Sequence, residues 1–411
     1  MKLKERIDEL AIFGGAPVSQ TPFHVGRPNI GRKEQFLKRV EDMLDRRWLT
    51  NAGPFVQEFE KKVADLLGVR HCIAMCNATV GLEIAIRALG MHDEVIVPSF
   101  TFVATAHALQ WQEITPVFCD IDPRTHNLDP EQVEKMITPR TSGIIGVHVW
   151  GRPCAVDALS QIARKHNLKL LFDAAHAFAC SHKGTMLGNF GHCEVLSFHA
   201  TKFLNTFEGG AVVTNDDELN KKIRLMKNFG FAGYDNVVYL GVNGKMSEVS
   251  AAMGLTGLES LNDFITVNKR NYSRYQNELK NVPGFSLISY DPSEKSNCQY
   301  VVAEVDEDQS GLSRDRLIEV LHAENVLARK YFHPGVHRMQ PYRSYFPHAG
   351  LLLPHTENLA SRVLVLPTGT AVTEEEITAI SRVIRLAVSH APGVNNHLAT
   401  RQPPAAGIKT R

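Results

Sequence analysis

The stretch that decides the fold is Ser197-Phe198-His199-Ala200-Thr201-Lys202, read together with Phe172-Asp173-Ala174-Ala175-His176 upstream. Each stretch includes the end of a short apolar run, 195–197 or 170–172, of the kind that forms a buried parallel strand. Asp173 and Lys202 are therefore expected at strand ends, where open α/β sheets bind their ligands. A lysine amine can form a Schiff base with an aldehyde cofactor, and pyridoxal phosphate needs such a lysine and an acid beside its ring nitrogen. Taken singly, Lys202 could equally be a solvated loop lysine and Asp173 a helix cap, so the rest of the chain has to decide.

Strand-like and helix-like runs alternate from residue 71 to about residue 215. The expected strands are 72–75, 94–98, 117–119, 144–149, 170–172, 195–197 and 210–214. This alternation predicts an α/β fold in three layers, with helices on both faces of a mostly parallel sheet. A helical pattern dominates from 217 to about 279. Beyond 287 we expect a smaller α+β region, with a strand at 300–305, a helix at 313–323 and a last helix from 374 to about 387.

The sequence predicts four regions. Residues 1–31 are expected to be irregular, residues 32–265 to form a large cofactor-binding domain, and residues 266–391 to form a small C-terminal domain. Residues 392–411 are rich in Pro, Ala, Asn and Thr and have little to bury, so a disordered tail is expected there.

Composition narrows the classes of function. The 411 residues carry a net charge of +1 without long basic runs, so no nucleic-acid or membrane-surface partner is expected. No apolar stretch approaches a membrane span, and the first residues do not lead into a signal-peptide core. Seven scattered cysteines fit reduced thiols in a cytoplasm. His71, Cys72 and Cys76 have no second ligand pair at zinc-finger spacing, so no metal site is expected.

Three further features fit a phosphorylated, aromatic cofactor. Asn77-Ala78-Thr79 falls between a strand and an expected helix, where backbone N–H groups can bind a phosphate. Ser197 adds a hydroxyl donor at another strand end, and Phe102 follows the strand at 94–98, where it could stack on a pyridine ring. Each has an ordinary alternative: a plain helix cap, a strand-terminal serine and a core phenylalanine.

The order of these features along the chain is what makes the case, because each follows a different strand of one sheet. These features occur in the same order as in the DegT/DnrJ/EryC1/StrS sugar aminotransferases, which the chain therefore resembles. Members of that family have the aspartate-aminotransferase-like fold, which is fold type I of the pyridoxal-phosphate enzymes. The matching segments lie between about residues 10 and 390 and include 48–54, 98–105, 173–177, 197–202, 209–215, 241–248, 331–334 and 363–367.

The resemblance implies a role for three residues around the cofactor ring. Lys202 would hold the cofactor through a Schiff base and then move a proton between cofactor and substrate carbons. Asp173 would pair with the pyridinium nitrogen, and Phe102 would stack on the ring.

The resemblance also implies how the phosphate is bound. Ala78 and Thr79 would contribute backbone amides, and Ser197 would contribute its hydroxyl. Asn243 would reach the phosphate in the other subunit's site, which implies an obligate homodimer.

Two positions depart from the family pattern. Many relatives carry Gln where His176 stands, next to the ring hydroxyl of the cofactor. A histidine can also donate a hydrogen bond there, and it adds a titratable group. Ala78 stands where glycine is more usual, which is acceptable unless the loop requires a positive φ.

The resemblance further implies that an amino group moves from glutamate to a nucleotide-linked ketosugar. Dehydrating relatives carry histidine in place of the lysine, so the presence of Lys202 favours transamination. Segments 23–31 and 46–51 look most like those of enzymes that form 4-amino-4,6-dideoxyglucose on a thymidine diphosphate carrier, which makes dTDP-4-keto-6-deoxyglucose the expected substrate. His333, His337 and Arg338 could meet the sugar or diphosphate, but such residues are commonly ordinary surface groups, so they are left out of the predicted site.

Three alternatives stay open at this point. The enzyme could aminate C3 of the sugar, since C3- and C4-aminating relatives share every cofactor motif. It could be a non-catalytic or regulatory protein that keeps the fold, although Lys202 and Asp173 argue against this. A nucleotide-binding dehydrogenase is disfavoured, because the first strand is not followed by Gly-x-Gly-x-x-Gly.

Overall fold

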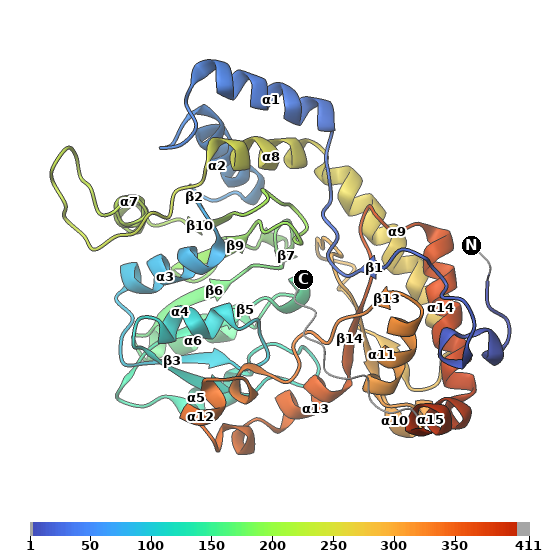
Figure 1. The fold of residues 1–411 in the computed structure, drawn as a ribbon. Helices are drawn as coiled ribbons and strands as arrows, with labels where there is room; N and C mark the ends of the chain where they lie inside the picture. Colours follow the sequence, from blue (N-terminus) through green and yellow to red (C-terminus); the bar gives the residue numbers. More distant parts are fainter. Residues whose placement is uncertain (1–2, 401–411) are drawn as a thin grey trace.

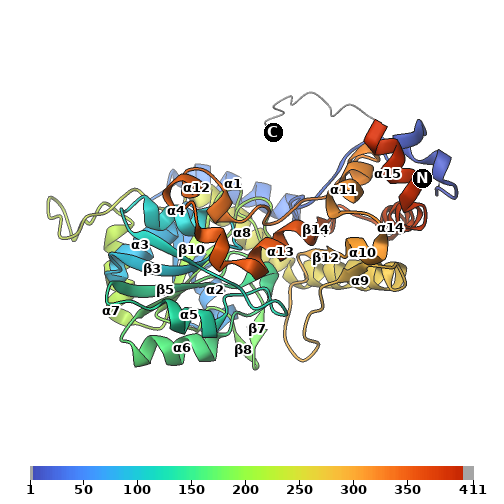
Figure 2. The ribbon, with the colours of Figure 1, turned by 90° about the horizontal axis from the view of Figure 1, so that it is seen from below.

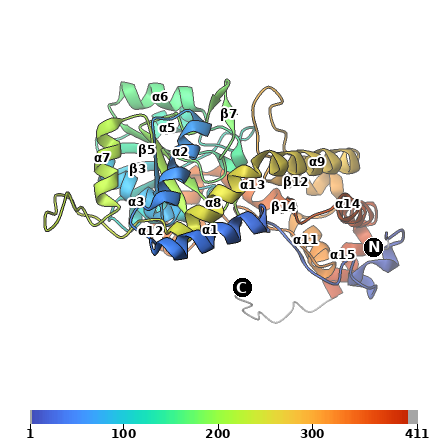
Figure 3. The ribbon, with the colours of Figure 1, turned by 90° about the horizontal axis from the view of Figure 1, so that it is seen from above.

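The computed structural model describes residues 3–400. A large and a small domain lie side by side, joined by the long helix α9 (Leu261–Leu279) (Figure 1). The views from below and above show the N-terminal segment beside the small domain (Figures 2 and 3). The boundary expected between residues 265 and 266 falls within α9, so this helix belongs to both domains.

The large domain is built on a seven-stranded sheet with the order β2-β10-β9-β6-β5-β3-β4. All neighbouring strands are parallel except that β10 runs antiparallel to both β2 and β9. The prediction of a mostly parallel sheet is thus confirmed, and each predicted strand overlaps an observed one. The strands are β2 (His71–Met75), β3 (Glu94–Pro98), β4 (Thr115–Cys119), β5 (Thr141–Val147), β6 (Lys169–Asp173), β9 (Cys193–Ser197) and β10 (Gly210–Thr214).

Helices cover both faces of this sheet because its strands are apolar on both faces. In β2, Cys72 and Ala74 face a core formed with α2 and α8, while Ile73 and Met75 face one formed with α3, α4 and α7. The helices of the large domain are α1 (Lys33–Arg46), α2 (Pro54–Leu67), α3 (Ala78–Leu89), α4 (Ala104–Gln110), α5 (Pro130–Met136), α6 (Val156–Lys165), α7 (Asp217–Met226) and α8 (Glu248–Glu259). A small hairpin pairs β7 (Ser181–His182) with β8 (Thr185–Met186).

The small domain packs helices on a three-stranded antiparallel sheet, β11-β12-β14. Its elements are β11 (Phe285–Leu287), β12 (Val301–Val305), α10 (Glu307–Ser310), α11 (Arg314–Ala323), β13 (Val326–Leu327), β14 (Val363–Leu366), α14 (Glu374–Ser389) and α15 (Ala391–Thr400). The expected strand at 300–305 and helix at 313–323 correspond to β12 and α11. The small domain is therefore α+β, as predicted.

The N-terminal segment is largely irregular, as expected, but it is packed against the small domain. Its short strand β1 (Phe23–His24) pairs with β13. The Lys4 ammonium donates to the buried Glu324 carboxylate at 2.7 Å. These contacts hold the segment next to the cavity described below.

Two other expectations need correction. Residues 392–400 are not a disordered tail but belong to α15, in which Val394 and Leu398 are buried in the core of the small domain; residues 401–411 lie outside the described part of the chain. The expected helical stretch from 217 to 279 is interrupted by residues 227–247, an irregular segment that we call the arm. The arm projects from the body of the protein beyond α7 (Figure 1).

The C-terminal half also contacts the large domain directly. Between β13 and β14 the chain runs back along the large domain through α12 (Tyr342–Tyr345) and α13 (Pro354–Arg362) (Figure 1). The Asp120 carboxylate accepts hydrogen bonds from the amides of His355 and Thr356 at 2.9 and 2.8 Å and so fixes the start of α13. Along residues 3–400, no helix is both long and apolar enough to cross a membrane.

Candidate active site

The carboxyl ends of β2, β6 and β9 and the start of β10 lie together at one edge of the large sheet. The register places them side by side: Gly210, at the start of β10, pairs with both Met75 and Ser197, and Asp173 pairs with Val195. A cavity of about 300 Å³ lies at this edge, enclosed by the large domain, the N-terminal segment and the small domain. This is the place where an open α/β sheet binds its ligand.

The cavity brings together all the predicted site residues except Asn243. Its predicted lining residues are Ala78, Thr79, Phe102, Asp173, His176, Ser197 and Lys202. Asn243 is exposed at the base of the arm, where its backbone carbonyl accepts a weak bond from the Cys76 thiol at 3.9 Å. It does not line the cavity of its own chain.

Asp173 ends β6 and is buried with both carboxylate oxygens engaged. Oδ2 accepts the Thr105 hydroxyl at 2.8 Å, and Oδ1 accepts the Ala175 amide at 3.1 Å. Burial raises the pKa of this carboxyl, while the Thr105 hydroxyl, the Ala175 amide and the Lys202 charge oppose the rise. The result is an oriented carboxylate that can accept from one more N–H donor.

Lys202 lies in the loop between β9 and β10, where its backbone amide donates to the His199 carbonyl at 2.8 Å. Burial lowers the pKa of its amine to about 8, although the nearby Asp173 charge raises it. A substantial fraction of the amine is therefore neutral near physiological pH. A neutral amine is the form that attacks an aldehyde.

The N-terminus of α3 forms the corner of the cavity. The Asn77 side chain caps the helix by accepting the Val80 amide at 2.8 Å. The amides of Ala78 and Thr79 precede it in the first turn, where a helix leaves its N–H groups without intrahelical partners and attracts anions. Ala78 is the first helical residue of α3 and has no positive φ, so alanine in place of the more usual glycine is compatible with this loop.

Gly210 and Ser197 complete this corner. A Cβ at Gly210 would lie 2.6 Å from the Ala78 backbone nitrogen, so only glycine lets β10 start this close to the helix end. The Ser197 oxygen accepts the His199 amide at 3.4 Å, which leaves its hydroxyl hydrogen free to donate into the cavity.

His176 lines the cavity as a neutral ring. Its Nδ1 accepts the backbone N–H of Trp150 at 3.2 Å, which places the ring proton on Nε2. Burial holds the pKa of this imidazole well below its ordinary value. The ring stacks on Phe332 with centroids 5.7 Å apart and is 4.7 Å from the Tyr300 ring. His176 is thus a fixed N–H donor, as the predicted contact with a ring hydroxyl requires.

These residues fit pyridoxal phosphate. A carboxylate is present for the ring nitrogen, an amine for the aldehyde, helix amides and a hydroxyl for the phosphate, and a histidine N–H for the ring hydroxyl. Phe102 is 57 % exposed, so its ring has a free face for stacking. Among residues 3–400, no cluster of His, Cys, Asp or Glu side chains is placed to hold a metal ion.

Sequence reasoning missed the part of the cavity that comes from outside the large domain. Val25 and Gly26 come from the N-terminal segment, and Tyr300, Tyr331 and Phe332 come from the small domain. Segments 23–31 and 331–334 carried a signal as stretches that resemble the family, but neither was assigned to the cofactor site.

The polar residues that were left out of the predicted site have structural roles. His337 is buried and bonds to the Ser99 hydroxyl and to the Glu357 carboxylate, each at 2.7 Å. Arg338 also bonds to Glu357, and His333 bonds to the Ala360 carbonyl.

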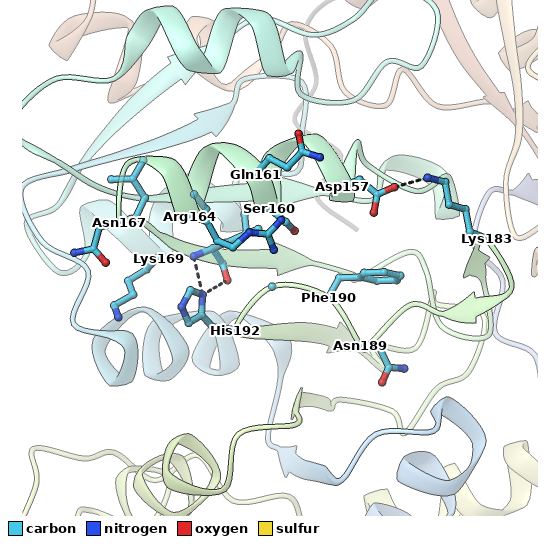
Figure 4. A pocket seen from close by; sticks show the side chains of 14 residues that line it. Asp157, Ser160, Gln161, Arg164, Asn167, Lys169, Lys183, Asn189, Phe190 and His192 are labelled. Atoms are coloured by element: carbon cyan, nitrogen blue, oxygen red, sulfur yellow. Dashed lines mark hydrogen bonds and ion pairs between the residues drawn. The ribbon is translucent and has the colours of Figure 1, made fainter.

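A second and larger depression, which we call the α6 groove, lies at the opposite end of the strands. It holds about 790 Å³ and is open to solvent beside Arg164, Lys169 and His192 (Figure 4). Its charged groups are dispersed: the Lys183 ammonium pairs with Asp157 at 2.6 Å, and the His192 ring accepts the Leu170 amide at 3.1 Å. Lys183 and Asp157 are both exposed and pair with each other, so the groove lacks the buried acid and amine that the cavity has.

Comparison with known proteins agrees with this geometry. The model of the DegT/DnrJ/EryC1/StrS aminotransferase family matches residues 31–385. The chain belongs to this family. Its fold is accordingly that of the sugar aminotransferases, as the sequence predicted, and it is an aminotransferase.

Individual members of the family match over nearly the whole chain. The dTDP-4-amino-4,6-dideoxy-D-glucose transaminases of Shigella dysenteriae and Escherichia coli are 39% and 38% identical; the matches cover 89% and 88% of this chain and 99% and 97% of those proteins. The crystal structure of DesI in the presence of its TDP-sugar product is 49% identical, with a TM-score of 0.92. That match covers 96% of this chain and 100% of DesI.

Proposed function

We propose that this family member moves an amino group from glutamate to the C4 keto group of dTDP-4-keto-6-deoxyglucose, with pyridoxal 5'-phosphate bound in the cavity. The observation that carries the proposal is that Lys202 and Asp173 line one cavity together with the N-terminus of α3. The choice of sugar is supported by the activities named for the Shigella and Escherichia relatives, and the choice of carrier also by the TDP-sugar product of DesI.

When bound, pyridoxal phosphate supplies an electron sink and stores the amino group between the two half-reactions. Asp173 would hold the protonated ring nitrogen with its charge and would orient the ring. The Lys202 amine, with its pKa lowered to about 8, would bind the cofactor aldehyde and, once released, would carry a proton between a carbon of the cofactor and a carbon of the substrate. A single lysine thus serves glutamate and sugar in turn.

The surrounding residues fix the position of the cofactor. The amides of Ala78 and Thr79 and the Ser197 hydroxyl bind the phosphate, where the helix N-terminus favours negative charge. His176 would donate from Nε2 to the ring hydroxyl, and the Phe102 ring would stack on the pyridine. The aromatic residues from the small domain help to exclude water from the reacting atoms.

The proposal includes a homodimer in which each arm contacts the other subunit. The arm exposes eight large apolar side chains: Phe229, Phe231, Tyr234, Val237, Val238, Tyr239, Leu240 and Val242. Such a surface is typical of a protein–protein contact. At the base of the arm, the Gly244 amide donates to the Lys227 carbonyl and the Cys76 amide donates to the Gly244 carbonyl, which fixes the neighbouring Asn243. Asn243 would then reach the phosphate in the site of the second copy.

We also propose that the enzyme works in the cytoplasm. All seven of its cysteines are free thiols, as is usual in a reducing compartment.

The decisive experiment offers the purified enzyme dTDP-, UDP- and GDP-linked ketosugars, with glutamate as donor and product analysis by NMR. We expect dTDP-4-amino-4,6-dideoxyglucose as the main product. A product aminated at C3 would overturn the C4 assignment, and preference for a UDP- or GDP-sugar would overturn the carrier. Failure of glutamate to bleach the visible absorption of the bound pyridoxal form would contradict transamination from this donor.

A further inference from the structure

We propose that Thr101 and Thr105 form a hydroxyl relay that keeps Asp173 ionised and oriented toward the cofactor ring nitrogen. The two threonines are positioning residues, since they act through Asp173. The inference rests on the proposed function, in which Asp173 binds the ring nitrogen of the cofactor. It adds two buried hydroxyl groups to the residues on which that role of Asp173 depends.

The direction of the relay follows from its geometry. The Thr105 hydroxyl lies 2.8 Å from Asp173 Oδ2 and 2.9 Å from the Thr101 hydroxyl. An ionised carboxylate can only accept, so Thr105 must donate its single hydroxyl hydrogen to Asp173. Thr105 then has only lone pairs left for Thr101, and Thr101 must donate to it. Both hydroxyls therefore point their hydrogens toward the carboxylate.

Thr105 makes this bond from the first turn of α4, where no helical carbonyl lies four residues earlier. A threonine within a helix commonly donates to the carbonyl four residues earlier. Three other threonines of this chain do so: Thr256 to Ala252 at 2.8 Å, Thr266 to Asn262 at 2.8 Å and Thr378 to Glu374 at 3.1 Å. Thr105 in α4 bonds instead to the side chain of the residue four positions earlier, Thr101, and to Asp173. Its position at the start of α4 thus leaves its hydroxyl to bond these two side chains.

The relay matters because Asp173 and both threonines are buried. Thr101 and Thr105 are 1% and 0% exposed, so a valine would fill either position without the cost of burying a hydroxyl. Burial by itself drives Asp173 toward the protonated form. The Thr105 hydroxyl is the strongest influence in the opposite direction and lowers the pKa of the carboxyl. A protonated Asp173 would not hold a proton on the cofactor nitrogen.

The test compares the full-length enzyme with its Thr105→Val, Thr105→Ser and Thr101→Val variants, each reconstituted with pyridoxal phosphate carrying an isotope-labelled ring nitrogen. Nitrogen NMR reports whether the ring nitrogen is protonated, and stopped-flow absorbance gives the rate of the glutamate half-reaction. The matched control is Thr256→Val, because Thr256 is also a buried helical threonine but does not line the cavity.

In Thr105→Val we expect the ring-nitrogen signal to move toward the neutral form. The half-reaction rate should fall about tenfold with little change in the glutamate concentration at half saturation, as for the loss of one hydrogen bond to a charged group. Thr105→Ser and Thr256→Val should behave as the wild type, and Thr101→Val should show a smaller effect of the same sign. The acid limb of the rate profile should move to higher pH in Thr105→Val. Lys202, His148 and His176, the other titratable groups around Asp173, are unchanged in that variant.

Each other outcome has a defined meaning. If Thr105→Val keeps a fully protonated ring nitrogen and a rate within twofold of wild type, the relay is overturned. If Thr105→Val does not fold, Thr101→Val decides, and an unchanged ring-nitrogen signal there overturns the relay as well. If the wild type itself fails to bind pyridoxal phosphate or to react with glutamate, the proposed function is what fails.

Discussion

The cavity between the domains and the α6 groove differ in volume, in charge and in their position relative to the strand ends. The groove is larger, about 790 Å³ against about 300 Å³, and carries more permanent cations. Yet Lys183 is neutralised by Asp157, and the groove lies where β6 begins. The cavity lies at the carboxyl ends of β2, β6 and β9, and the Lys202 amine and the Asp173 carboxyl there shift each other's pKa. Convergence of strand ends, rather than volume, marks the active site.

The largest difference between the cavity and the groove is expected when one lysine of each is replaced and the rate of amino transfer is measured. Lys202→Ala is expected to lower amino transfer by at least about a thousandfold, because the nucleophile and proton carrier are lost together. Lys183→Ala removes a lysine from the groove and should leave the rate within about twofold. Steady-state assays with glutamate and the ketosugar measure both. Equal losses in the two variants would break the comparison.

The next largest effect is expected at the acid. Asp173→Asn keeps the shape of the side chain but removes the charge that holds the ring nitrogen protonated, so the half-reaction should slow about a hundredfold. The counterpart in the groove, Asp157→Asn, should have no effect on the rate. Stopped-flow absorbance with glutamate measures the half-reaction rate of both variants. An Asp173→Asn rate within a few-fold of wild type would contradict the role of Asp173 in keeping the ring nitrogen protonated.

A pH experiment addresses the environment of Lys202. The neutral amine is the reactive form, and burial lowers its pKa to about 8. Capture of pyridoxal phosphate by apoenzyme should therefore rise with pH through a midpoint near pH 8, whereas for an unburied lysine the midpoint would lie at about pH 10. Because Asp173 raises the pKa of the amine, the midpoint in Asp173→Asn should move to lower pH. A wild-type midpoint near that of free lysine would contradict the lowered pKa of Lys202.

His176 should show a smaller effect that separates packing from chemistry. His176→Leu removes the acceptor of the buried Trp150 amide, so the free energy of unfolding should fall by about 1–3 kcal/mol, and binding of pyridoxal phosphate should weaken. His176→Gln can still donate to the ring hydroxyl and should bind the cofactor almost as tightly as wild type. Urea unfolding and cofactor titration measure the two effects. If His176→Gln binds as poorly as His176→Leu, the donor role is wrong.

The smallest effects are expected in the α6 groove. Arg164→Ala and Lys169→Ala change exposed side chains far from the carboxyl ends of the strands, so rate and stability should stay close to wild type. A loss of activity in either variant would show that the groove takes part in the reaction and would weaken the comparison.

The cavity corner could be predicted because its residues follow strands directly. The run that ends at Asp173 and the run that precedes Lys202 each signal a buried strand, and a parallel sheet brings such ends together without further information. The same reasoning could not find Tyr300 or Tyr331, because their place in the cavity depends on how the small domain packs against the large one.

Two elements escaped prediction for other physical reasons. The composition of 392–400 is that of a tail, but Val394 and Leu398 lie four residues apart on one face of α15 and become buried against the small domain. The arm carries apolar residues that resemble a helical pattern. Glycines with positive φ at Gly230 and Gly233 instead turn the chain outward, and local pattern does not indicate this.

The most direct test is to identify the lysine that holds the cofactor. The enzyme is loaded with pyridoxal phosphate, treated with borohydride to make the lysine–cofactor bond permanent, digested and mapped by mass spectrometry. The structure predicts that the label falls on Lys202. A label on Lys169 or Lys183 in the groove, or no label at all, would contradict the assignment of the cavity as the active site.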